Sequence, residues 1–484
     1  MFLNNNEPRS ATTDIMPVSQ FFFDNLARYG EAPAAIEGEL QVSYQQLQVR
    51  CAEFSQQLNQ INKQTNSPQK QLIFLKAHNN IATLVAYLTT LQNRHAVLLL
   101  DPDIDQSKLD KLIASYQPNL LIDSQTIEQC HSKPLVLESK LALLLSTSGS
   151  TGSAKQVCLS ADNVQANALS IVEYLPLLAS DKTITTLPFY YSYGLSVLNS
   201  HLLVGACIVF NQHSLVSREF WQLFKQHNIN SFAGVPQSYE MLLRLRFERM
   251  DLPSLRYFTQ AGGKLAADKI QPLARYANAN DKQFFVMYGQ TEATARMAYL
   301  KSELCETKPH AIGQAIPGGQ FSLHDEHGEL ITQPEESGEL IYRGTNIMLG
   351  YANCLSDLTE FTPLNELATG DIAYRDSEGD YVICGRIKRF IKLFGLRINL
   401  DEVETLLANK GLECYCLGDD TKLLVALTND VVAQQHIDIN ELKMWLSREL
   451  QINHNVINIK PVAQLPLTNN GKKDYPAVLT MLDD

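Results

Sequence analysis

Short apolar runs alternate with longer stretches along the first 175 residues of this 484-residue chain. Residues 72–77 and 96–100 have the length of buried strands, and the apolar stretch 81–91 between them has the length of a helix. A strand, a helix and a strand at this spacing predict a parallel crossover. The apolar segments 120–123 and 141–145 are expected to extend the same sheet.

Two helices next to this sheet are predicted from their capping residues. Ser43 and Gln46 form a capping box at the start of residues 43–61, which place four apolar side chains on one helical face: Leu47, Cys51, Phe54 and Leu58. Ser160 is the expected cap of the second helix.

A second series of apolar segments covers residues 183–189, 206–210, 231–236, 256–263 and 284–292. Several of these segments end in Gly or Pro, and helix-like stretches such as 239–247 separate them. In open α/β sheets the ligand collects at the carboxyl ends of the strands, so we expect the motifs at these ends to share one site. From residue 313 to 381 the pattern changes to short strands with Gly-rich turns.

The last hundred residues are predicted to form a compact α+β unit that can move as a body. The expected order is strand (390–393), helix (400–408), strands (412–417 and 423–428), helix (439–450) and strand (456–463). The predicted fold class is α/β. A large N-terminal domain, residues 1–387, contains mostly parallel αβ subdomains and a small β subdomain at about 313–384, and a small mobile C-terminal domain covers residues 388–484.

Composition and charge narrow the class of protein. Hydrophobic residues at 45% and charged residues at 19% are globular values. The net charge of −12 argues against nucleic acid or an anionic membrane as a partner. The nine scattered cysteines are interpreted as reduced thiols, because Cys414 and Cys416 have no third zinc ligand nearby. The N-terminus lacks the pattern of a secretory signal and no apolar stretch reaches membrane-helix length, so a cytoplasmic location is expected.

A loop of hydroxyls and glycines follows the apolar residues 143–145 and ends at Lys155. Its hydroxyl groups and unshielded backbone N–H groups suit a polyphosphate. The residues concerned are Thr147, Ser148, Gly149, Ser150, Thr151 and Gly152. Ser153 and Ala154 separate the last glycine from the lysine, which disfavours an ordinary P-loop kinase or GTPase. For this loop alone, a flexible turn is the alternative interpretation.

Seven motifs together resemble the superfamily of adenylate-forming enzymes, which comprises acyl- and aryl-CoA synthetases, peptide-synthetase adenylation domains and luciferases. They are STSGSTGSAK (146–155), AGGKL (261–265), MYGQTE (287–292), GELIYRGTNIMLGY (338–351), TGD (369–371), GRIKRFIKLFGLRI (385–398) and PLTNNGKKD (466–474). The resemblance covers nearly the whole chain and is strongest to acyl-CoA synthetases and acyl-AMP ligases.

The resemblance implies that ATP converts a carboxylic acid into an acyl-adenylate with release of pyrophosphate. The hydroxyl loop and Lys155 would then hold the β- and γ-phosphates. Thr291 and Glu292 would contact the α-phosphate and Mg²⁺, and a carboxylate is the hard ligand that Mg²⁺ prefers. Lys472 would bridge the substrate carboxylate and the α-phosphate and so favour the crowded anionic transition state. Lys473 beside it is expected to be solvated.

The nucleotide's adenosine would occupy a flat slot in this family. Gly262, Gly263 and Lys264 would bring bare backbone against one face of adenine, and Tyr288, followed by Gly289, would cover the other. Asp371 would accept both ribose hydroxyls, and Arg386 would reach the ribose or a phosphate. A surface role beside a turn is the alternative for Arg386, and a solvated position is the alternative for Glu292.

The resemblance also implies a second half-reaction in which a thiol takes the acyl group. The C-terminal domain would swing about a hinge at Lys388. Gly395 would let a pantetheine arm pass close to the backbone. Gly395→Leu is therefore predicted to block thioester formation while pyrophosphate exchange survives.

The predicted substrate pocket includes Tyr190, Tyr191, Tyr193, Gly234 and Met287. No acidic residue lies between Asp181 and Glu219 to pair with an α-ammonium group, so a fatty or aromatic acid is favoured over an amino acid. Arg296 has two interpretations: a partner for a second anionic group of the substrate, or a structural ion-pair partner.

Three functions remain open on the sequence alone. The first is an acid–CoA ligase, and the second is an acyl-AMP ligase that loads a separate carrier protein, so CoA or a phosphopantetheine arm would be the acceptor. The third is a non-catalytic, adenylate-binding scaffold. ATP and Mg²⁺ are the expected cofactors for the first two. The chain carries no recognisable carrier domain, so the thiol is expected to come from outside.

Overall fold

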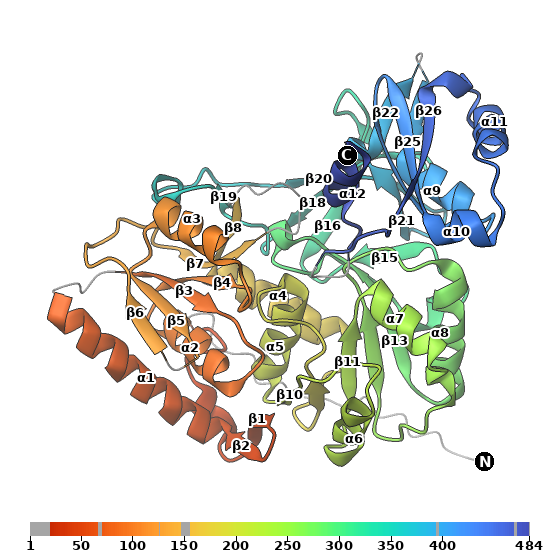
Figure 1. The fold of residues 1–484 in the computed structure, drawn as a ribbon. Coiled ribbons are helices and arrows are strands. Elements are labelled where there is room, and N and C mark those ends of the chain that lie inside the picture. The colour runs from red at the N-terminus through yellow and green to blue at the C-terminus, as the bar shows by residue number, and fades with distance from the viewer. Residues whose placement is uncertain are drawn as a thin grey trace, which may run out of the picture.

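The computed structural model describes residues 20–65, 70–124, 126–146, 155–393, 396–468 and 472–483. It contains a large N-terminal α/β domain with two sheets and a smaller C-terminal domain, drawn in blue at the upper right of Figure 1. This arrangement confirms the predicted fold class.

The first sheet confirms the predicted crossover. Strands β3 and β4 are parallel neighbours with Leu72 opposite Ala96, and α2 joins them. In spatial order the sheet comprises β19 (Gly350–Ala352), β8 (Gln156–Ser160), β7 (Leu141–Ser146), β4 (Ala96–Leu100), β3 (Leu72–Lys76), β5 (Leu120–Asp123) and β6 (Thr126–Gln129). Helices α1 (Tyr44–Thr65), α2 (Ile81–Gln92), α3 (Gln106–Tyr116) and α4 (Ala161–Tyr174) accompany it.

The expected capping residues begin both predicted helices. The amide of Gln46 donates to Ser43 Oγ at 3.2 Å, and the amide of Ser43 donates to Gln46 Oε1 at 2.9 Å. Ser160 and Asn163 form the same reciprocal pair at the start of α4. Two of the unpaired amides that every helix start exposes are thereby satisfied in each helix.

The second sheet contains the strands of the second apolar series together with most of the short strands of the Gly-rich region, residues 313–381. Its order is β17 (Leu330–Ile331), β16 (Gly319–His324), β18 (Gly338–Gly344), β20 (Leu367–Arg375), β21 (Tyr381–Arg386), β15 (Ala311–Ala315), β14 (Ala298–Leu300), β13 (Gln283–Tyr288), β12 (Tyr257–Gln260), β11 (Ser231–Gly234), β9 (Lys182–Ile184), β10 (Cys207–Phe210), β1 (Pro33–Glu37) and β2 (Leu40–Ser43). The strands from β13 to β10 are parallel, and the pairs from β13 to β17 are antiparallel. Helices α5 (Ser192–Val204), α6 (Arg218–Gln226), α7 (Pro236–Arg244) and α8 (Ala267–Ala279) lie along the parallel part.

One predicted strand is shorter than expected. The segment 183–189 leaves the sheet after Ile184. Thr186 Oγ1 then donates to the carbonyl of Ala233, and Pro188 has no amide with which to continue a ladder. The departing chain leads directly into α5.

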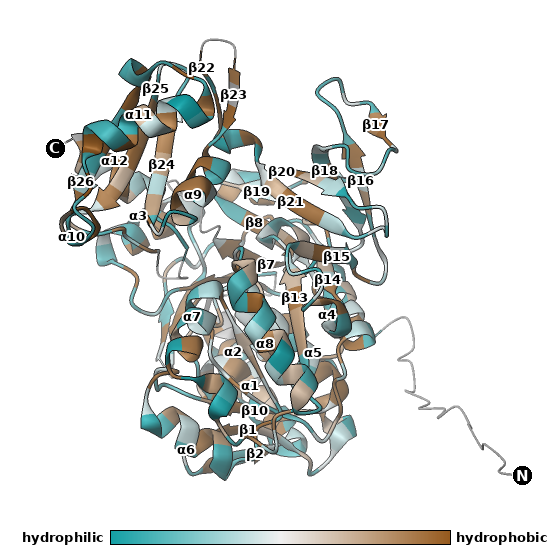
Figure 2. Cartoon of the chain, turned by 90° about the vertical axis from the view of Figure 1, so that its right-hand side faces the viewer, coloured by the Kyte–Doolittle hydropathy of each residue, from teal (hydrophilic) through white to brown (hydrophobic). Residues whose placement is uncertain are grey.

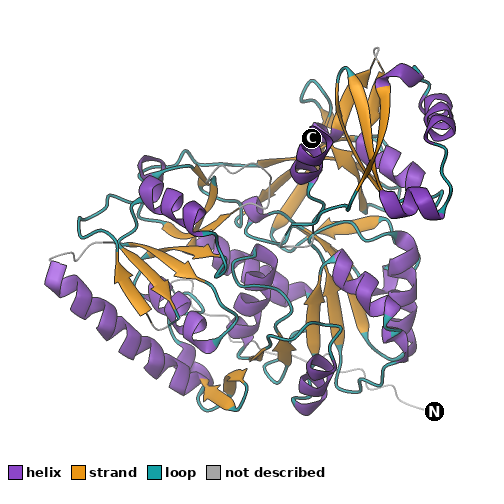
Figure 3. Cartoon of the chain, viewed as in Figure 1, coloured by secondary structure: helices purple, strands orange, loops and turns teal. Residues whose placement is uncertain are grey.

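The core of the N-terminal domain lies between the two sheets. Figure 3 shows α4 and α5 in this position, and the two helices pack against each other. One apolar cluster includes Leu143 from the first sheet, Ala168 from α4, Leu198 from α5 and Ile208 from the second sheet. This cluster therefore joins the two sheets through the helices between them.

The C-terminal domain follows the predicted order of elements. It contains β22 (Phe390–Leu393), β23 (Leu396–Asn399), α9 (Leu400–Ala408), β24 (Cys414–Asp419), β25 (Lys422–Thr428), α10 (Asn429–Gln434), α11 (Ile439–Leu450), β26 (Ile457–Val462) and α12 (Tyr475–Asp483). Its strands are mostly brown in Figure 2, and they pack on α9 and α11 to form a core of their own. Within the described ranges, no helix combines the length and the apolarity needed to cross a membrane.

Candidate active site

Three glycines stand at the carboxyl ends of neighbouring parallel strands, as the motif positions predict. Gly234 ends β11, Gly262 follows β12 and Gly289 follows β13. Gly262 has φ +86°, and a Cβ placed there would lie 2.4 Å from the hydroxyl of Tyr191. A Cβ on Gly289 would lie 1.7 Å from the carbonyl of Ala295. Both positions need a bare backbone because the chain passes another segment at close range.

The remaining residues of the predicted adenine slot lie beside this edge. Gly263 lies against Pro236, and its carbonyl accepts a hydrogen bond from Gln260 Nε2 at 2.8 Å. Lys264 is exposed. Gly234 was predicted to line the substrate pocket. A Cβ placed on it would lie 2.7 Å from the ring of Tyr239, so this glycine packs against that ring.

Asp371 and Arg386 meet as cross-strand partners on β20 and β21. Asp371 is 2% exposed, and its Oδ1 accepts a hydrogen bond from Arg386 Nε at 2.8 Å. Its Oδ2 accepts from the hydroxyl of Tyr288 at 2.5 Å and from Gln290 Nε2 at 2.9 Å. The charge of Asp371 is the main cause that raises the pKa of Arg386, and burial is the main cause that raises the pKa of Tyr288. The structure thus brings together three predicted residues and adds Gln290, which lies within the YGQTE motif.

The Thr291–Ala293 turn after β13 is clamped by the segment before β19. The amide of Met348 donates to the carbonyl of Glu292 at 2.9 Å, and the hydroxyl of Tyr351 donates to Glu292 Oε1 at 2.9 Å. Asn346 Nδ2 donates to the carbonyl of Ala293 at 2.8 Å. These three donors belong to the motif at 338–351, and the sequence alone indicates no role for them. Their structural task is to fix the direction of the Glu292 carboxylate.

Lys155 contacts Tyr351, the residue that donates to the Glu292 carboxylate. Its Nζ lies 3.4 Å from the centroid of the Tyr351 ring, a cation–π contact. Thr291 Oγ1 lies 3.2 Å from the hydroxyl of Ser192 at the start of α5. The other predicted phosphate-binding residues, 147–152, lie outside the described residues.

Lys472 comes to this site from the C-terminal domain. Its turn is closed by the amide of Thr468, which donates to the carbonyl of Lys472 at 2.7 Å. Its Nζ lies 5.9 Å from the centroid of the Tyr191 ring. Burial is the main cause that lowers the pKa of Lys472, Arg386 lowers it further, and the charges of Glu292 and Asp371 raise it. The ammonium therefore lies within the electrostatic field of three predicted site residues.

Lys473 is exposed, in line with the expectation that it is solvated, and it also makes an ion pair. Its side chain is 42% exposed, but its Nζ donates to Glu404 Oε2 at 2.5 Å. Glu404 also accepts from Arg389 Nη2 at 2.7 Å, from the amide of Cys416 at 2.7 Å and from the hydroxyl of Tyr475 at 3.1 Å. This buried carboxylate ties the lysine turn to the body of the C-terminal domain.

The predicted hinge residue, Lys388, is exposed in the Ile387–Arg389 turn that joins β21 to β22. This turn connects the two domains. The predicted thiol-channel residue, Gly395, lies outside the described residues.

Three of the predicted pocket residues share one apolar cluster, and one does not. Tyr191, Tyr193 and Met287 are buried together with residues of β11, β12 and α4. The hydroxyl of Tyr193 donates to the carbonyl of Thr259 at 2.9 Å. Tyr190 instead packs against the core between the sheets. Burial and the charge of Asp101 raise its pKa.

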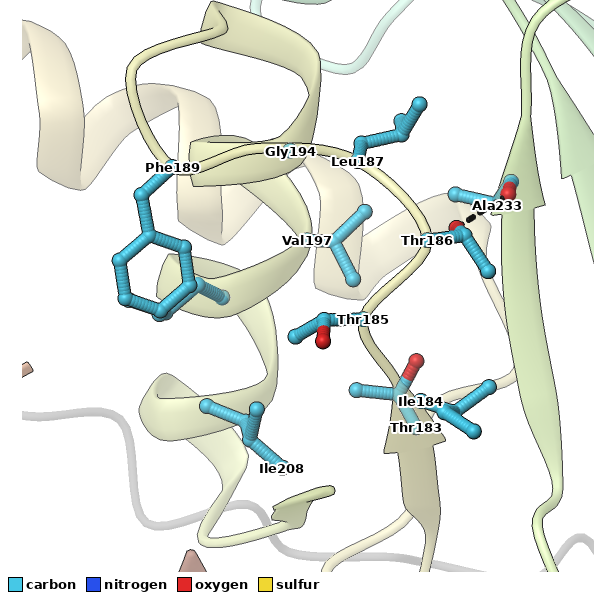
Figure 4. Close-up of a pocket in the computed structure, with 11 residues that line it drawn as sticks. Thr183, Ile184, Thr185, Thr186, Leu187, Phe189, Gly194, Val197, Ile208 and Ala233 are labelled. Carbon is cyan, nitrogen blue, oxygen red and sulfur yellow. Dashed lines mark hydrogen bonds between the residues drawn. The ribbon is translucent and has the colours of Figure 1, made fainter. Parts of the chain in front are cut away.

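A cavity lies beside this cluster, between β9, α5 and β11 (Figure 4). Its volume is about 20 Å³, and it is lined by apolar and threonine side chains, among them Thr185, Leu187 and Val197. A space of this size accommodates about one water molecule. It is too small to hold an acyl substrate.

Comparison with known proteins agrees with this geometry. Residues 131–352 match the sequence profile of a family described as "AMP-binding enzyme". Over 273 residues, the chain is 30% identical to an oxalate–CoA ligase of Arabidopsis thaliana, a match that covers 55% of this chain. The chain therefore contains an AMP-binding domain over residues 131–352. It spans about half the length of this relative, 52%.

Other relatives match over more of their length. A D-alanine–D-alanyl carrier protein ligase of Bacillus licheniformis is 27% identical, with 69% of this chain and 72% of that protein covered. The solved structure of o-succinylbenzoate CoA synthetase from Bacillus subtilis, in complex with the acyl-adenylate intermediate OSB-AMP, has a TM-score of 0.77 and 20% identity. That comparison covers 96% of this chain and 98% of the other, so the two chains share one fold over both domains.

Proposed function

We propose that this protein activates a carboxylic acid with ATP, releases pyrophosphate and transfers the acyl group to the thiol of CoA. The observation that carries the proposal is the position of Lys472. An ammonium from the C-terminal domain lies in the same field as Glu292, Asp371 and Arg386 of the N-terminal domain. A carboxylate and an α-phosphate both carry negative charge, and a cation between them lowers the repulsion that opposes adenylate formation.

Each of the other site residues would bind a different part of the nucleotide. Asp371 would accept the ribose hydroxyls in place of its present contacts with Tyr288 and Gln290. Lys155 and the hydroxyl loop would hold the departing pyrophosphate. The bare backbone at Gly262 would lie against adenine, because its φ of +86° and the nearby Tyr191 leave no room for a side chain.

Glu292 fits the role of a magnesium ligand. Its Oε1 is oriented by Tyr351, and Oε2 has no hydrogen-bond donor among the residues that the structure describes. Mg²⁺ is commonly held by one or two carboxylates together with substrate phosphates. Within the same described part, no three His, Cys, Asp or Glu side chains form a metal site by themselves. The metal would supply charge neutralisation at the phosphates, and Glu292 would position it.

The pocket favours an acid without an α-amino group. The segment that supplies Tyr191 and Tyr193 has no acidic residue between Asp181 and Glu219. A buried ammonium without a carboxylate partner would be destabilised by several kcal/mol. A fatty or aromatic acid is therefore the proposed substrate class.

A carrier protein is the alternative acceptor, and the similarity to the D-alanyl carrier protein ligase is the observation that favours it. In either case we propose that a C-terminal domain starting at residue 388 turns about Lys388 between the half-reactions. In the N-terminal domain, residues 1–387, the proposed β subdomain covers about 313–384. A non-catalytic scaffold is disfavoured because Glu292, Asp371 and Lys472 are brought together.

Pyrophosphate exchange with a panel of carboxylic acids tests the proposal. Carboxylate-dependent exchange is expected for an enzyme, and its absence with every acid would support the scaffold. Mass spectrometry of the thioester, with CoA and carrier proteins offered together, distinguishes the two acceptors.

A further inference from the structure

Arg296 is a buried cation in the wall of the proposed substrate pocket. It lies four residues beyond Glu292, and its side chain is 2% exposed. Its backbone carbonyl accepts hydrogen bonds from Asn167 Nδ2 and Asn346 Nδ2, both at 3.0 Å. Two helices and the segment before β19 thus hold this residue in place, since Asn167 belongs to α4, Ser196 to α5 and Asn346 to that segment.

Every recorded partner of the guanidinium is neutral. Nε donates to Ser196 Oγ at 3.2 Å, and Nη1 donates to the hydroxyl of Tyr174 at 3.0 Å and to Met287 Sδ at 2.6 Å. The ring of Tyr193 lies 4.7 Å from Cζ. Within the described ranges, no carboxylate lies within 4.0 Å of the guanidinium, and no acceptor is paired with Nη2.

Asp181 is an acidic residue whose charge reaches the same region, and it is already paired. The charge of Asp181 raises the pKa of His201, and the charge of Arg296 lowers it. However, the carboxylate of Asp181 accepts hydrogen bonds from Arg256 Nη1 and from the amide of Leu178. Its charge is therefore compensated by Arg256. The structural ion-pair interpretation of Arg296 lacks a partner among the described residues.

A buried guanidinium without an anion is unfavourable. Arginine is not deprotonated in proteins, so the charge persists at any physiological pH. Removing such a charge from water is strongly unfavourable unless an opposite charge compensates it. The neighbouring hydroxyls, thioether and aromatic face offset only part of this desolvation penalty, because none of them carries a full negative charge. The site is therefore completed by an anionic ligand.

The anion would belong to the substrate, because Arg296 and Lys472 lie against neighbouring rings of one aromatic pair. Lys472 Nζ is 5.9 Å from the ring centroid of Tyr191. The rings of Tyr191 and Tyr193 are in edge contact at 6.2 Å, and Arg296 follows beside Tyr193. The charge of Arg296 also lowers the pKa of Tyr191, although burial raises it more, to about 12.

We propose that Arg296 binds a second anionic group of the substrate, so that the acid activated here carries a carboxylate or similar group at its far end. This inference rests on the proposed function and narrows its substrate class. The carboxyl group that becomes adenylated would lie near Lys472, and the second group would form a charge-assisted pair with Nη2 of Arg296, because both N–H groups of Nη1 already donate to Tyr174 and Met287. A plain fatty acid would leave the guanidinium buried against hydrocarbon.

Pyrophosphate exchange with matched acid pairs tests the inference. The pairs are glutarate with its monomethyl ester and terephthalate with its monomethyl ester, which differ only in the charge at the far end. The wild-type protein should use the better diacid with a kcat/KM about 100-fold above that of its ester, the scale of a buried, charge-assisted pair. This measurement needs no variant and is unaffected by any folding defect.

Variants of Arg296 separate recognition from a structural role. Arg296→Met should lower kcat/KM for the diacid about 100-fold and change that for the ester less than about threefold. Arg296→Lys, which keeps the charge, should retain an intermediate preference for the diacid. Arg275→Met is the matched control, because Arg275 is 63% exposed and pairs with Glu306 on the surface.

Two results would overturn the inference while leaving the proposed function intact. One is exchange with monoacids or esters that equals or exceeds exchange with the diacids. The other is an equal loss for both members of each pair in Arg296→Met. Exchange with no carboxylic acid at all would overturn the proposed function and this inference with it.

Discussion

Replacing Glu404 with Gln tests how the turn that carries Lys472 and Lys473 is held in place. The Glu404 side chain is 8% exposed and lies between Arg389, 13% exposed, and Lys473, 42% exposed. A glutamine has the same shape but carries no charge. It still offers Oε1 to Arg389 and to the amide of Cys416, but it turns an NH₂ group toward the Lys473 ammonium.

The expected loss of stability follows from these exposures. Breaking a buried ion pair costs about 3–5 kcal/mol when one partner is removed outright. The Gln variant retains a neutral acceptor for Arg389, so we expect about 2–3 kcal/mol less stability for the C-terminal domain. Lys473→Gln alone should reduce stability by less than about 1 kcal/mol, because that lysine is partly solvated.

Urea unfolding followed by tryptophan fluorescence measures this loss. The chain has two tryptophans, and Trp445 of α11 packs in the C-terminal core and contacts Lys410. In a Trp221→Phe background, Trp445 reports on the C-terminal domain alone. Glu449→Gln, the same chemical change at an exposed position of α11, is the control.

The reasoning would be refuted if the C-terminal transition of Glu404→Gln matched that of Glu449→Gln. The variant should also lose more of adenylate formation than of thioester formation from a supplied acyl-adenylate, because Lys473 adjoins Lys472. An equal loss of both half-reactions would show that Glu404 supports only the stability of the domain.

Two further predictions concern the nucleotide side of the site. Gly262→Ala combines an unfavourable φ of +86° with a methyl group 2.4 Å from the Tyr191 hydroxyl, so the KM for ATP in pyrophosphate exchange should rise about tenfold or more. Gly318→Ala, with φ +80° and no neighbour within 4 Å, is the control, and an equal effect of both would refute the steric argument. The kcat/KM for exchange should fall at alkaline pH, because only the charged form of Lys472 offsets the repulsion between the two anions. The midpoint should lie below about 10.4, the ordinary lysine value, since burial and Arg386 lower the pKa of Lys472. Lys472→Arg stays charged over this range, so an unchanged alkaline limb in that variant would assign the titration to another group.

Helices with one apolar face and clear caps could be predicted from the sequence, whereas a helix buried on all sides could not. The predicted helices at 400–408 and 439–450 agree with α9 and α11 to the residue. Helix α5 has no polar face, because 11 of its residues are buried, so its apolar pattern has no helical period. Helix α12, which has Pro476 in its first turn, was not predicted from the sequence.

The identity of the site residues could be predicted better than their contacts. Asp371 and Arg386 were each assigned from their motifs, but their direct pairing depends on the register of β20 and β21, which contains an irregularity after Ile372. No local pattern encodes that register. The role of Glu404 in holding Lys473 depends likewise on a contact across 69 residues.

Whether Arg296 has a charged partner could not be predicted from the sequence either. The sequence shows an arginine after the YGQTE motif, but whether an acidic residue meets it depends on the packing of α4, α5 and β13. Only the folded chain shows that its neighbours are Ser196, Tyr174, Met287 and Tyr193, none of which is charged.

Lys472→Ala provides the most direct test of the central claim, that the C-terminal domain brings a catalytic ammonium to the adenylation site. Pyrophosphate exchange and thioester formation from a supplied acyl-adenylate should be measured side by side on the same preparation. The account predicts that exchange is lost and that thioester formation survives, because Lys472 acts only while the acid and the α-phosphate are being joined. Full exchange activity in Lys472→Ala, or an equal loss of both half-reactions, would contradict it.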